Sequence, residues 1–240
     1  MFNLCTTPVR TLFVVLLMIC PSLSAAPIRF LAWDESITTR KLSFSDGKEL
    51  TELDDLHPHK RSKPLNWTVS ELPPGLLALD RSSADGKPIS APIKLSPDLK
   101  APLVLILPDP KHPSGIRCFV IDEDTAGFTW GTLRFINATG KELLVKQDKE
   151  IKALPETWKA VDIAPGGSMR NIGIQMASRA DLKSVLYSAV WEHDPDVRKL
   201  IIVVPGTDAQ SGSLNLKIIP EDRRALAPVS PASNAGADAP

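Results

Sequence analysis

Cysteine is scarce in this chain, which excludes a fold held together by disulfides. Two of the three cysteines, Cys5 and Cys20, lie in an N-terminal segment that we expect to be removed. Cys118 remains, in the apolar run 116–121, where we expect a buried strand residue rather than a nucleophile. A cupredoxin-type copper site is also excluded, because no histidine or methionine closely follows Cys118. The core must therefore be stabilised by apolar burial.

A charge excess is also absent, since 28 basic residues balance 28 acidic ones. A neutral chain gives no reason to expect nucleic acid or an anionic membrane surface as a partner. Tyr187 is the only tyrosine, and recognition surfaces usually use several. The composition argues against a broad aromatic platform.

Catalytic signatures are missing from the sequence as well. There is no Gly-x-Ser-x-Gly elbow, phosphate-binding loop, His-Glu-x-x-His helix or dinucleotide fingerprint. We predict no cofactor, and the sequence leans against an enzyme.

What the sequence does contain begins with a targeting segment. A short basic start is followed by the apolar run 11–19 and then by small residues, the pattern of a signal peptide over residues 1–25. Cleavage is expected within Ser24-Ala25-Ala26, after Ser24 or Ala25, because Pro27 disfavours a cut after Ala26. Lipid attachment at Cys20 is the alternative. The apolar run is too short to span a bilayer, so we predict an exported, periplasmic or extracellular protein with no transmembrane segment in the mature chain.

Proline and periodicity predict an all-β fold. Of the 22 prolines, 11 lie between Pro58 and Pro113, and proline breaks helices. Period-2 alternation and Asp-Gly or Pro-Gly turns recur along the chain. We predict an antiparallel β-sandwich of two packed immunoglobulin-like domains. The expected parts are an N-terminal β domain over 26–108, a linker at 109–115, a C-terminal sandwich over 116–220 and a disordered Ala/Pro-rich tail over 221–240.

The expected strands follow this alternation. In the N-terminal part a hairpin is predicted around Asp46-Gly47, with arms 36–44 and 48–53. In the C-terminal part, Phe128 to Gln147 reads as a hairpin turning at 137–140, with large apolar side chains on both faces of its first arm. Residues 182–191 fit a strand or a short helix, and we favour the strand. The other expected strands are 28–33, 76–79, 89–95, 103–107, 117–121, 157–163, 169–176, 197–204 and 213–219.

Four residues are candidate metal ligands, although none is predicted as a site. His57 and His59 have a spacing that suits a metal on a strand, but Pro58 places them in a polar loop. Asp122 and Asp124 could bind a hard cation such as calcium, yet they read first as a solvated turn.

Tryptophan offers the candidate ligand-binding residues. Exposed indole rings stack on sugars, whereas in a sandwich most are buried. We take Trp67 and Trp158 as the candidates. Asn66 and Asn137 match glycosylation acceptors if the host is eukaryotic.

A resemblance follows from three features: Gly-x-Leu-Arg-Phe-Ile-Asn-Ala-Thr from Gly131, a Leu-Leu-Val return strand and an Ala-Pro-Gly-Gly turn. The chain resembles uncharacterised exported β-sandwich proteins of Planctomycetes and Verrucomicrobia, which carry no catalytic motif. Two functions stay open. One is a non-catalytic binding or structural module that contacts a cell-envelope polymer or envelope protein. The other is a polysaccharide-acting enzyme whose loop acids and histidines, such as Asp122, Asp124, His57 and His193, converge.

Overall fold

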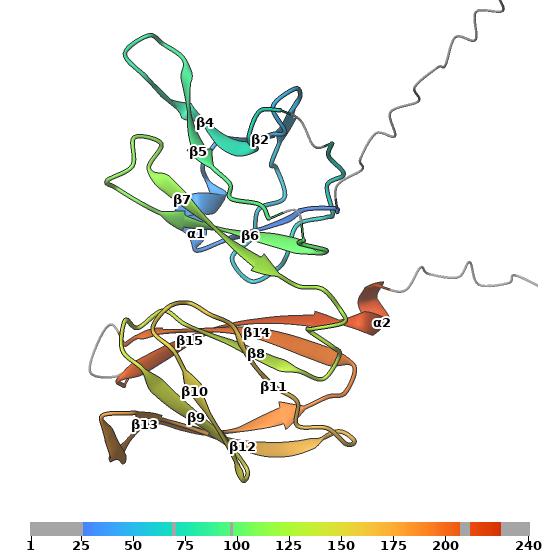
Figure 1. Cartoon of the computed structure of the whole chain (residues 1–240), viewed down its shortest axis with the longest axis vertical. Helices are drawn as coiled ribbons and strands as arrows, with labels where there is room; N and C mark the ends of the chain where they lie inside the picture. Colours follow the sequence, from blue (N-terminus) through green and yellow to red (C-terminus); the bar gives the residue numbers. More distant parts are fainter. Residues whose placement is uncertain (1–25, 69–70, 97, 207–211, 227–240) are drawn as a thin grey trace, which may run out of the picture.

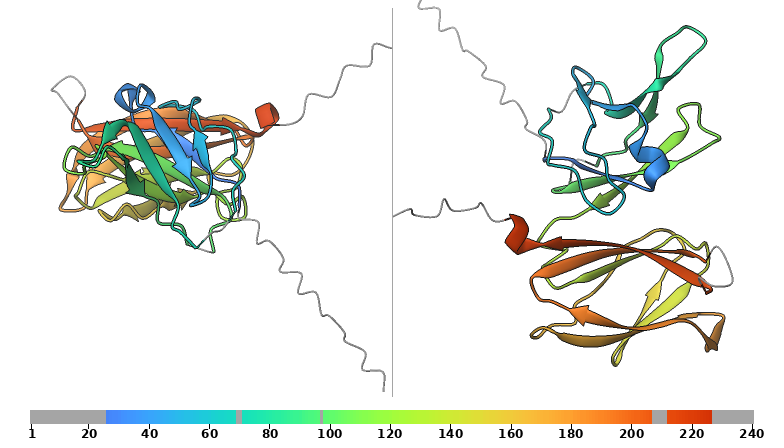
Figure 2. Two further views of the ribbon diagram at one scale, coloured as in Figure 1. Left: turned by 90° about the horizontal axis from the view of Figure 1, so that it is seen from above. Right: turned by 180° about the vertical axis from the view of Figure 1, so that it is seen from behind.

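A computed structural model describes residues 26–226, apart from 69–70, 97 and 207–211. In this part of the chain the secondary structure consists of strands β1 to β15 and two one-turn helices, α1 (Glu35–Thr38) and α2 (Arg223–Leu226). The strands form four sheets in two halves, one above the other in Figure 1 and seen from above and from behind in Figure 2. The prediction of an all-β protein is confirmed.

The outer sheet of the N-terminal half has the order β3-β2-β4-β5. The predicted hairpin at Asp46-Gly47 is confirmed, because the Asp46 carboxylate accepts hydrogen bonds from the backbone N–H groups of Lys48 and Glu49, both at 2.8 Å, and Gly47 has φ 93°. Its first arm is shorter than predicted. Asp34 caps α1 at Ser36 and Ile37, so a helical turn replaces the strand's start. The strands are β2 (Leu42–Ser45), β3 (Leu50–Glu52), β4 (Gly75–Ser82) and β5 (Pro88–Pro92).

The inner sheet of the N-terminal half has the order β1-β6-β7, formed by Arg29–Ala32, Pro102–Pro108 and Ile116–Asp122. Strands β6 and β7 are antiparallel neighbours, with Pro108 opposite Ile116. The predicted linker 109–115 is therefore wrong, since these residues are a hairpin loop closed by a 2.9 Å bond from Asp109 N–H to the Gly115 carbonyl. Proline has no backbone N–H to donate to a neighbouring strand, so it can end strand pairing without marking a domain boundary.

The C-terminal half is a sandwich of two sheets, ordered β11-β8-β14-β15 and β10-β9-β12-β13. Residues 182–191 form a strand, as predicted. Strand β10 is unpredicted, and a tight turn at Asp148, with φ 51°, leads into it. The strands are β8 (Leu133–Asn137), β9 (Leu143–Gln147), β10 (Glu150–Leu154), β11 (Val161–Ile163), β12 (Arg170–Ser178), β13 (Asp181–His193), β14 (Val197–Pro205) and β15 (Leu214–Asp222).

The predicted hairpin from Phe128 to Gln147 is also wrong, because β8 and β9 belong to opposite sheets. The turn that joins them, with Ala138 and Thr139 half-buried and Gly140 to Glu142 exposed, passes from one sheet to the other. The buried Asn137 side chain stabilises it by donating to the carbonyls of Lys141 and Leu154, at 2.8 and 2.9 Å. Both faces of β8 are buried, as predicted.

The strand order does not show the predicted immunoglobulin-like arrangement, and it corrects the expectation of purely antiparallel sheets. In immunoglobulin constant-type domains the first two strands are neighbours, whereas β8 lies between β11 and β14. Two pairs, β1 with β6 and β8 with β14, are parallel, so the sheets are mixed. Both parallel pairs join strands far apart in sequence, which local turn signals do not reveal.

The two inner sheets pack against each other, so the halves share a core. Strand β6 contributes Val104 and Ile106 to the N-terminal core and Leu103, Leu105 and Leu107 to the junction. Strand β14 alternates in the same way, with Ile201 and Val203 in the sandwich core and Leu200 and Ile202 at the junction. Because successive strand residues face opposite sides, one apolar run fills two cores.

The predicted terminal segments fall mainly outside the described residues. The signal-peptide region 1–25, with Ser24 and Ala25, lies there entirely, and so do residues 227–240 of the predicted tail. The tail boundary at 221 is too early, since Glu221 is buried in β15 and α2 follows. Within the described residues, neither helix is long and apolar enough to cross a bilayer.

Candidate functional site at the junction of the two halves

A cluster of buried charges joins the two halves. Glu123, which follows β7, is fully buried and accepts from Arg29 Nη2 at 2.8 Å and from Arg61 Nη2 at 2.6 Å. Glu221 of β15 pairs with Arg29 and with Arg198 Nε at 2.7 Å. Charged groups lose hydration on burial, and partners must replace it. The pairing therefore depends on how the halves are placed.

The turn after β7 separates two sides of this junction. Glu123 points into the charge cluster, whereas Asp122 and Asp124 line a pocket. The Asp122 carboxylate accepts from the N–H groups of Ala101 and Asp124, at 3.2 and 3.1 Å. These bonds shape the turn and leave the Asp122 backbone carbonyl to accept from Arg134.

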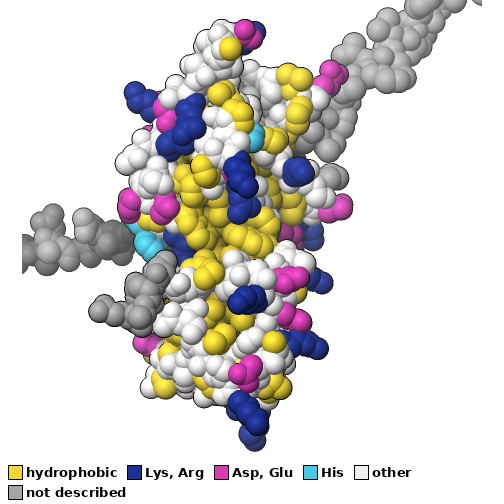
Figure 3. Space-filling view, turned by 90° about the vertical axis from the view of Figure 1, so that its left-hand side faces the viewer, with side chains coloured by type: hydrophobic (Ala, Val, Ile, Leu, Met, Phe, Trp, Pro, Cys, Tyr) yellow, Lys and Arg dark blue, Asp and Glu magenta, His cyan; other side chains and the backbone are white. Residues whose placement is uncertain are grey.

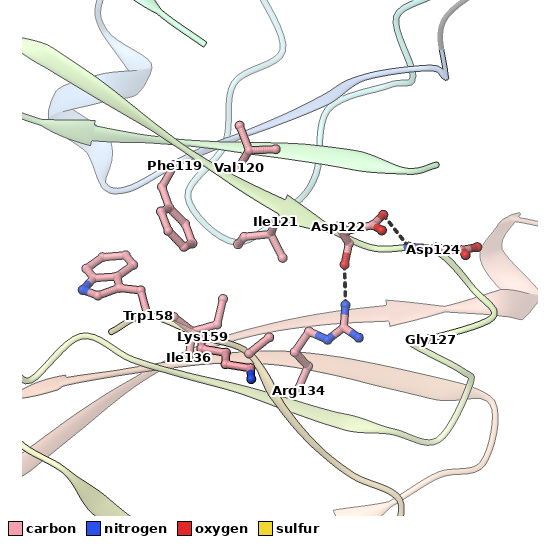
Figure 4. Close-up of a pocket in the computed structure, with 11 residues that line it drawn as sticks. Phe119, Val120, Ile121, Asp122, Asp124, Gly127, Arg134, Ile136, Trp158 and Lys159 are labelled. Atoms are coloured by element: carbon pink, nitrogen blue, oxygen red, sulfur yellow. Dashed lines mark hydrogen bonds between the residues drawn. The ribbon is translucent and has the colours of Figure 1, made fainter. Parts of the chain in front are cut away.

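The pocket beside Asp122 has a volume of about 410 Å³ and lies between the inner sheets. In Figure 4, Phe119 and Ile121 extend into it from β7 above, and Ile136 from β8 below. One end is apolar and aromatic, and the other carries Asp122, Asp124 and Arg134. Such a mixture suits a ligand with an apolar face and polar substituents.

Trp158 forms the aromatic end of the pocket in an unusual backbone conformation. Its φ is +63°, and this left-handed region is costly for a bulky side chain. The indole contacts the Phe119 ring edge to face at 5.0 Å, and the Arg117 guanidinium lies 5.4 Å from the indole centroid. Backbone strain of this kind gathers at functional sites. Of the two predicted ligand-binding residues, Trp158 lines this pocket.

The polar end of the pocket is organised by Arg134 of β8. Its guanidinium binds both Asp162 carboxylate oxygens, at 2.7 and 2.6 Å, and also donates to the Asp122 carbonyl. It also lies 4.3 Å from the Phe128 ring centroid. These contacts fix Arg134 as a rigid part of the wall. Lys159 is exposed at the rim.

One face of the junction is largely apolar (Figure 3). Figure 3 shows hydrophobic side chains in a band that crosses from one half to the other on the face it presents. The junction core includes partly buried residues, among them Trp33, Phe119 and Trp158. A contiguous apolar area is a common mark of a binding surface.

The other predicted residues lie elsewhere. His57 and His59 contact each other, with the His57 Nδ1 accepting from the His59 N–H at 2.9 Å. Trp67 packs on the N-terminal core and donates to the Ala26 carbonyl at 2.9 Å. Within the described residues, no three His, Cys, Asp or Glu side chains gather as a metal site.

His193 is a buried structural residue. Its side chain is 2% exposed, and Nε2 lacks a hydrogen-bond partner among the described residues. Burial lowers its pKa, and the nearby charges of Arg170 and Lys199 lower it further. The histidines and acids named for an enzyme are thus distributed over three places: the pocket, the 55–64 loop and the sandwich edge.

Sequence reasoning missed the residues that complete the pocket. Arg134 and Phe119 were assigned only to strands, and Lys159 was not singled out. One signal was present for Arg134, a charged residue on an otherwise apolar buried strand, because such residues are almost always paired. The sequence also could not show that Glu123 joins the charge cluster while Asp122 and Asp124 line the pocket, because this depends on the geometry of the turn.

No family model matches the chain, and no curated protein matches its sequence.

Proposed function

We propose that this protein is an exported, non-catalytic binding module whose junction pocket holds a sugar unit of a cell-envelope polysaccharide. The observation that carries the proposal is Trp158, held at φ +63° with its ring against Phe119 at one end of the pocket. Sugars bind by placing an apolar ring face on an aromatic side chain while carboxylates accept from their hydroxyls. Asp122 and Asp124 supply such acceptors at the other end.

Export is supported by the N-terminal sequence, with its basic start, apolar run and small residues. A periplasmic or extracellular location provides access to envelope polymers. The junction pocket also fits this role, because ligand sites commonly form where two domains meet.

The enzyme alternative receives less support from the geometry. It requires His57, His193, Asp122 and Asp124 to converge, but only the two aspartates line this pocket. No histidine or cysteine is among the described residues that line it. A base and a nucleophile within reach of each other would be needed for most hydrolytic chemistry.

The test is glycan binding by the purified mature chain. Envelope oligosaccharides would be screened on an array, and hits measured by isothermal titration calorimetry. Trp158→Asn removes the ring while keeping a residue that tolerates the left-handed backbone, and it should weaken binding about tenfold or more. The control is Val190→Asn on β13, whose side chain is 71% exposed.

Two results would overturn the proposal: no glycan binds, or Trp158→Asn binds as the unaltered chain does. Release of reducing sugar, abolished by Asp122→Asn or Asp124→Asn, would instead establish the enzyme alternative.

A further inference from the structure

A second cavity borders the buried charge cluster, and it is separate from the Trp158 pocket. Its volume is about 590 Å³, and its walls come from the 55–64 loop, the end of β15 and α2. The two cavities share none of their lining residues. Its role is therefore independent of the proposed sugar site.

Among the described ionic side chains of this cavity, the acids have hydrogen-bond or ion-pair partners, whereas the lysines form no ion pair. Asp55 accepts from the Lys63 backbone N–H at 2.8 Å, Asp222 binds Arg224 at 2.7 Å, and Glu221 binds two arginines. Lys60 and Lys63 are exposed on the rim, and within the described part of the chain neither forms an ion pair with a carboxylate. Two ammonium groups remain available to an anion.

The charge cluster behind the cavity adds to the preference of the cavity for an anion. Three guanidiniums, from Arg29, Arg61 and Arg198, share the two carboxylates of Glu123 and Glu221, which leaves one positive charge in excess. The side chains of Arg61 and Arg198 are only 4% and 3% exposed. Arg29 and Arg61 both line the cavity. Poorly hydrated positive charge raises the affinity of the adjoining space for an anion.

The remaining lining determines what kind of anion fits. Apart from Ser62 it is mainly aliphatic, from Leu56, Pro64, Pro220, Ala225 and Leu226, and among the described lining residues His57 supplies the only ring other than proline. This wall offers no indole or phenyl face for a sugar to stack on. An aliphatic chain can bury its surface there while its charged end meets the lysines.

We propose that this cavity binds an aliphatic carboxylate, with the carboxylate between Lys60 and Lys63 and the chain against Leu56 and Leu226. The carboxylate can belong to a free fatty acid or to the end of an apolar peptide, because both present the same group on an aliphatic body.

The test uses the mature chain and defined probes in calorimetric titrations at low ionic strength. Decanoate represents the free acid, and acetyl-Ala-Val-Ala-Leu with a free carboxyl end represents the peptide. Decyltrimethylammonium, the same chain with opposite charge, should bind far more weakly. The double variant Lys60→Gln, Lys63→Gln should weaken probe binding about fivefold to tenfold, the range for two exposed ionic contacts, and added salt should do the same.

Matched variants separate the contributions of the two lysines, of the aliphatic wall and of the Trp158 pocket to probe binding. Lys87→Gln with Lys94→Gln removes two exposed lysines elsewhere and should leave affinity unchanged. Leu226→Ser changes a side chain that is already 57% exposed, so it should weaken decanoate without unfolding the chain. Trp158→Asn should not affect decanoate, so this proposal and the sugar site can fail separately.

Binding of either carboxylate probe with the expected lysine dependence supports the proposal, and the stronger probe identifies the source. The proposal is overturned if neither probe binds, if decyltrimethylammonium binds as well as decanoate, or if the Lys60, Lys63 variant keeps full affinity.

Discussion

Arg29 of β1 and Glu221 of β15, which are 192 positions apart in the chain, form an ion pair across the junction of the two halves. Arg29 also reaches Glu123 at 2.8 Å, so one guanidinium bridges a carboxylate from each half. Both residues line the cavity rimmed by Lys60 and Lys63, and Asp122 and Asp124, on either side of Glu123 in the chain, line the Trp158 pocket. Placement of the halves, stability and binding therefore depend on the same small region.

Removing one charge from this cluster should be costly. Glu123→Gln would leave three arginines with a single carboxylate in a site where the Glu123 side chain is fully buried. Breaking a buried pair in this way costs about 3–5 kcal/mol, so urea unfolding should show a loss of this size in the free energy of unfolding. Glu142→Gln breaks the exposed pair with Arg179 and should cost less than about 1 kcal/mol. Equal losses in the two variants would contradict the role of burial.

Position 158 should reverse the usual ranking of alanine and glycine. Glycine in place of alanine normally destabilises, but at φ +63° the β-carbon of alanine is itself unfavourable. Trp158→Gly should therefore be more stable than Trp158→Ala by about 1 kcal/mol. Both variants lose the same indole packing, so their difference in thermal or urea unfolding isolates the backbone. A more stable alanine variant would show that residue 158 is not left-handed.

His193 should make stability depend on pH below neutrality. Its pKa in the folded chain is lowered by burial and by Arg170 and Lys199, so the unfolded chain takes up the proton at a higher pH. Stability contributed by neutral His193 is fully present above the unfolded-state pKa, about 6.5. It declines as pH falls below that value toward the folded pKa. Urea unfolding from pH 8 to pH 5 should show this slope, and His193→Leu should flatten it. The exposed His59→Leu variant serves as the control and should keep the slope.

Cys118 should be unreactive in the folded protein. Burial raises the pKa of its thiol to about 12, and the thiolate is the species that reacts. Ellman's reagent at pH 8 should label the native chain far more slowly than the chain in guanidinium chloride. Rapid labelling without denaturant would place Cys118 in a different environment. A Cys118→Ser variant, which should give no signal in either condition, corrects for reagent hydrolysis.

The sequence predicted the architecture best where the signal is local. Continuous apolar runs and alternating apolar residues identified β1, β6, β12, β13 and β14, and the Asp46-Gly47 turn fixed the hairpin between β2 and β3. These features depend on neighbours a few residues apart. The sequence misled where one composition serves two purposes: the prolines of 108–113 suggested a linker, but Pro108 ends β6 and the other two lie within a hairpin loop.

The candidate site was harder to predict, because its parts come from separate strands. The sequence predicts Trp158 as a ligand-binding candidate and Asp122 as a metal-ligand candidate. The residues next to them in the sequence do not indicate that the two line one pocket with Phe119 and Arg134. The left-handed backbone of Trp158 could not be predicted either, because such a conformation is usually expected only at glycine.

By itself, then, the sequence determined that this chain forms strands and that β8 is buried on both of its faces. Only the tertiary structure decided that β8 and β9 separate into opposite sheets and that the two halves share a core. It alone also showed that Arg29, Glu123 and Glu221 meet, and that Arg29 and Glu221 line a cavity. The physical reason is that strand formation follows from residues close in sequence, whereas sheet pairing and charge placement follow from contacts between distant segments.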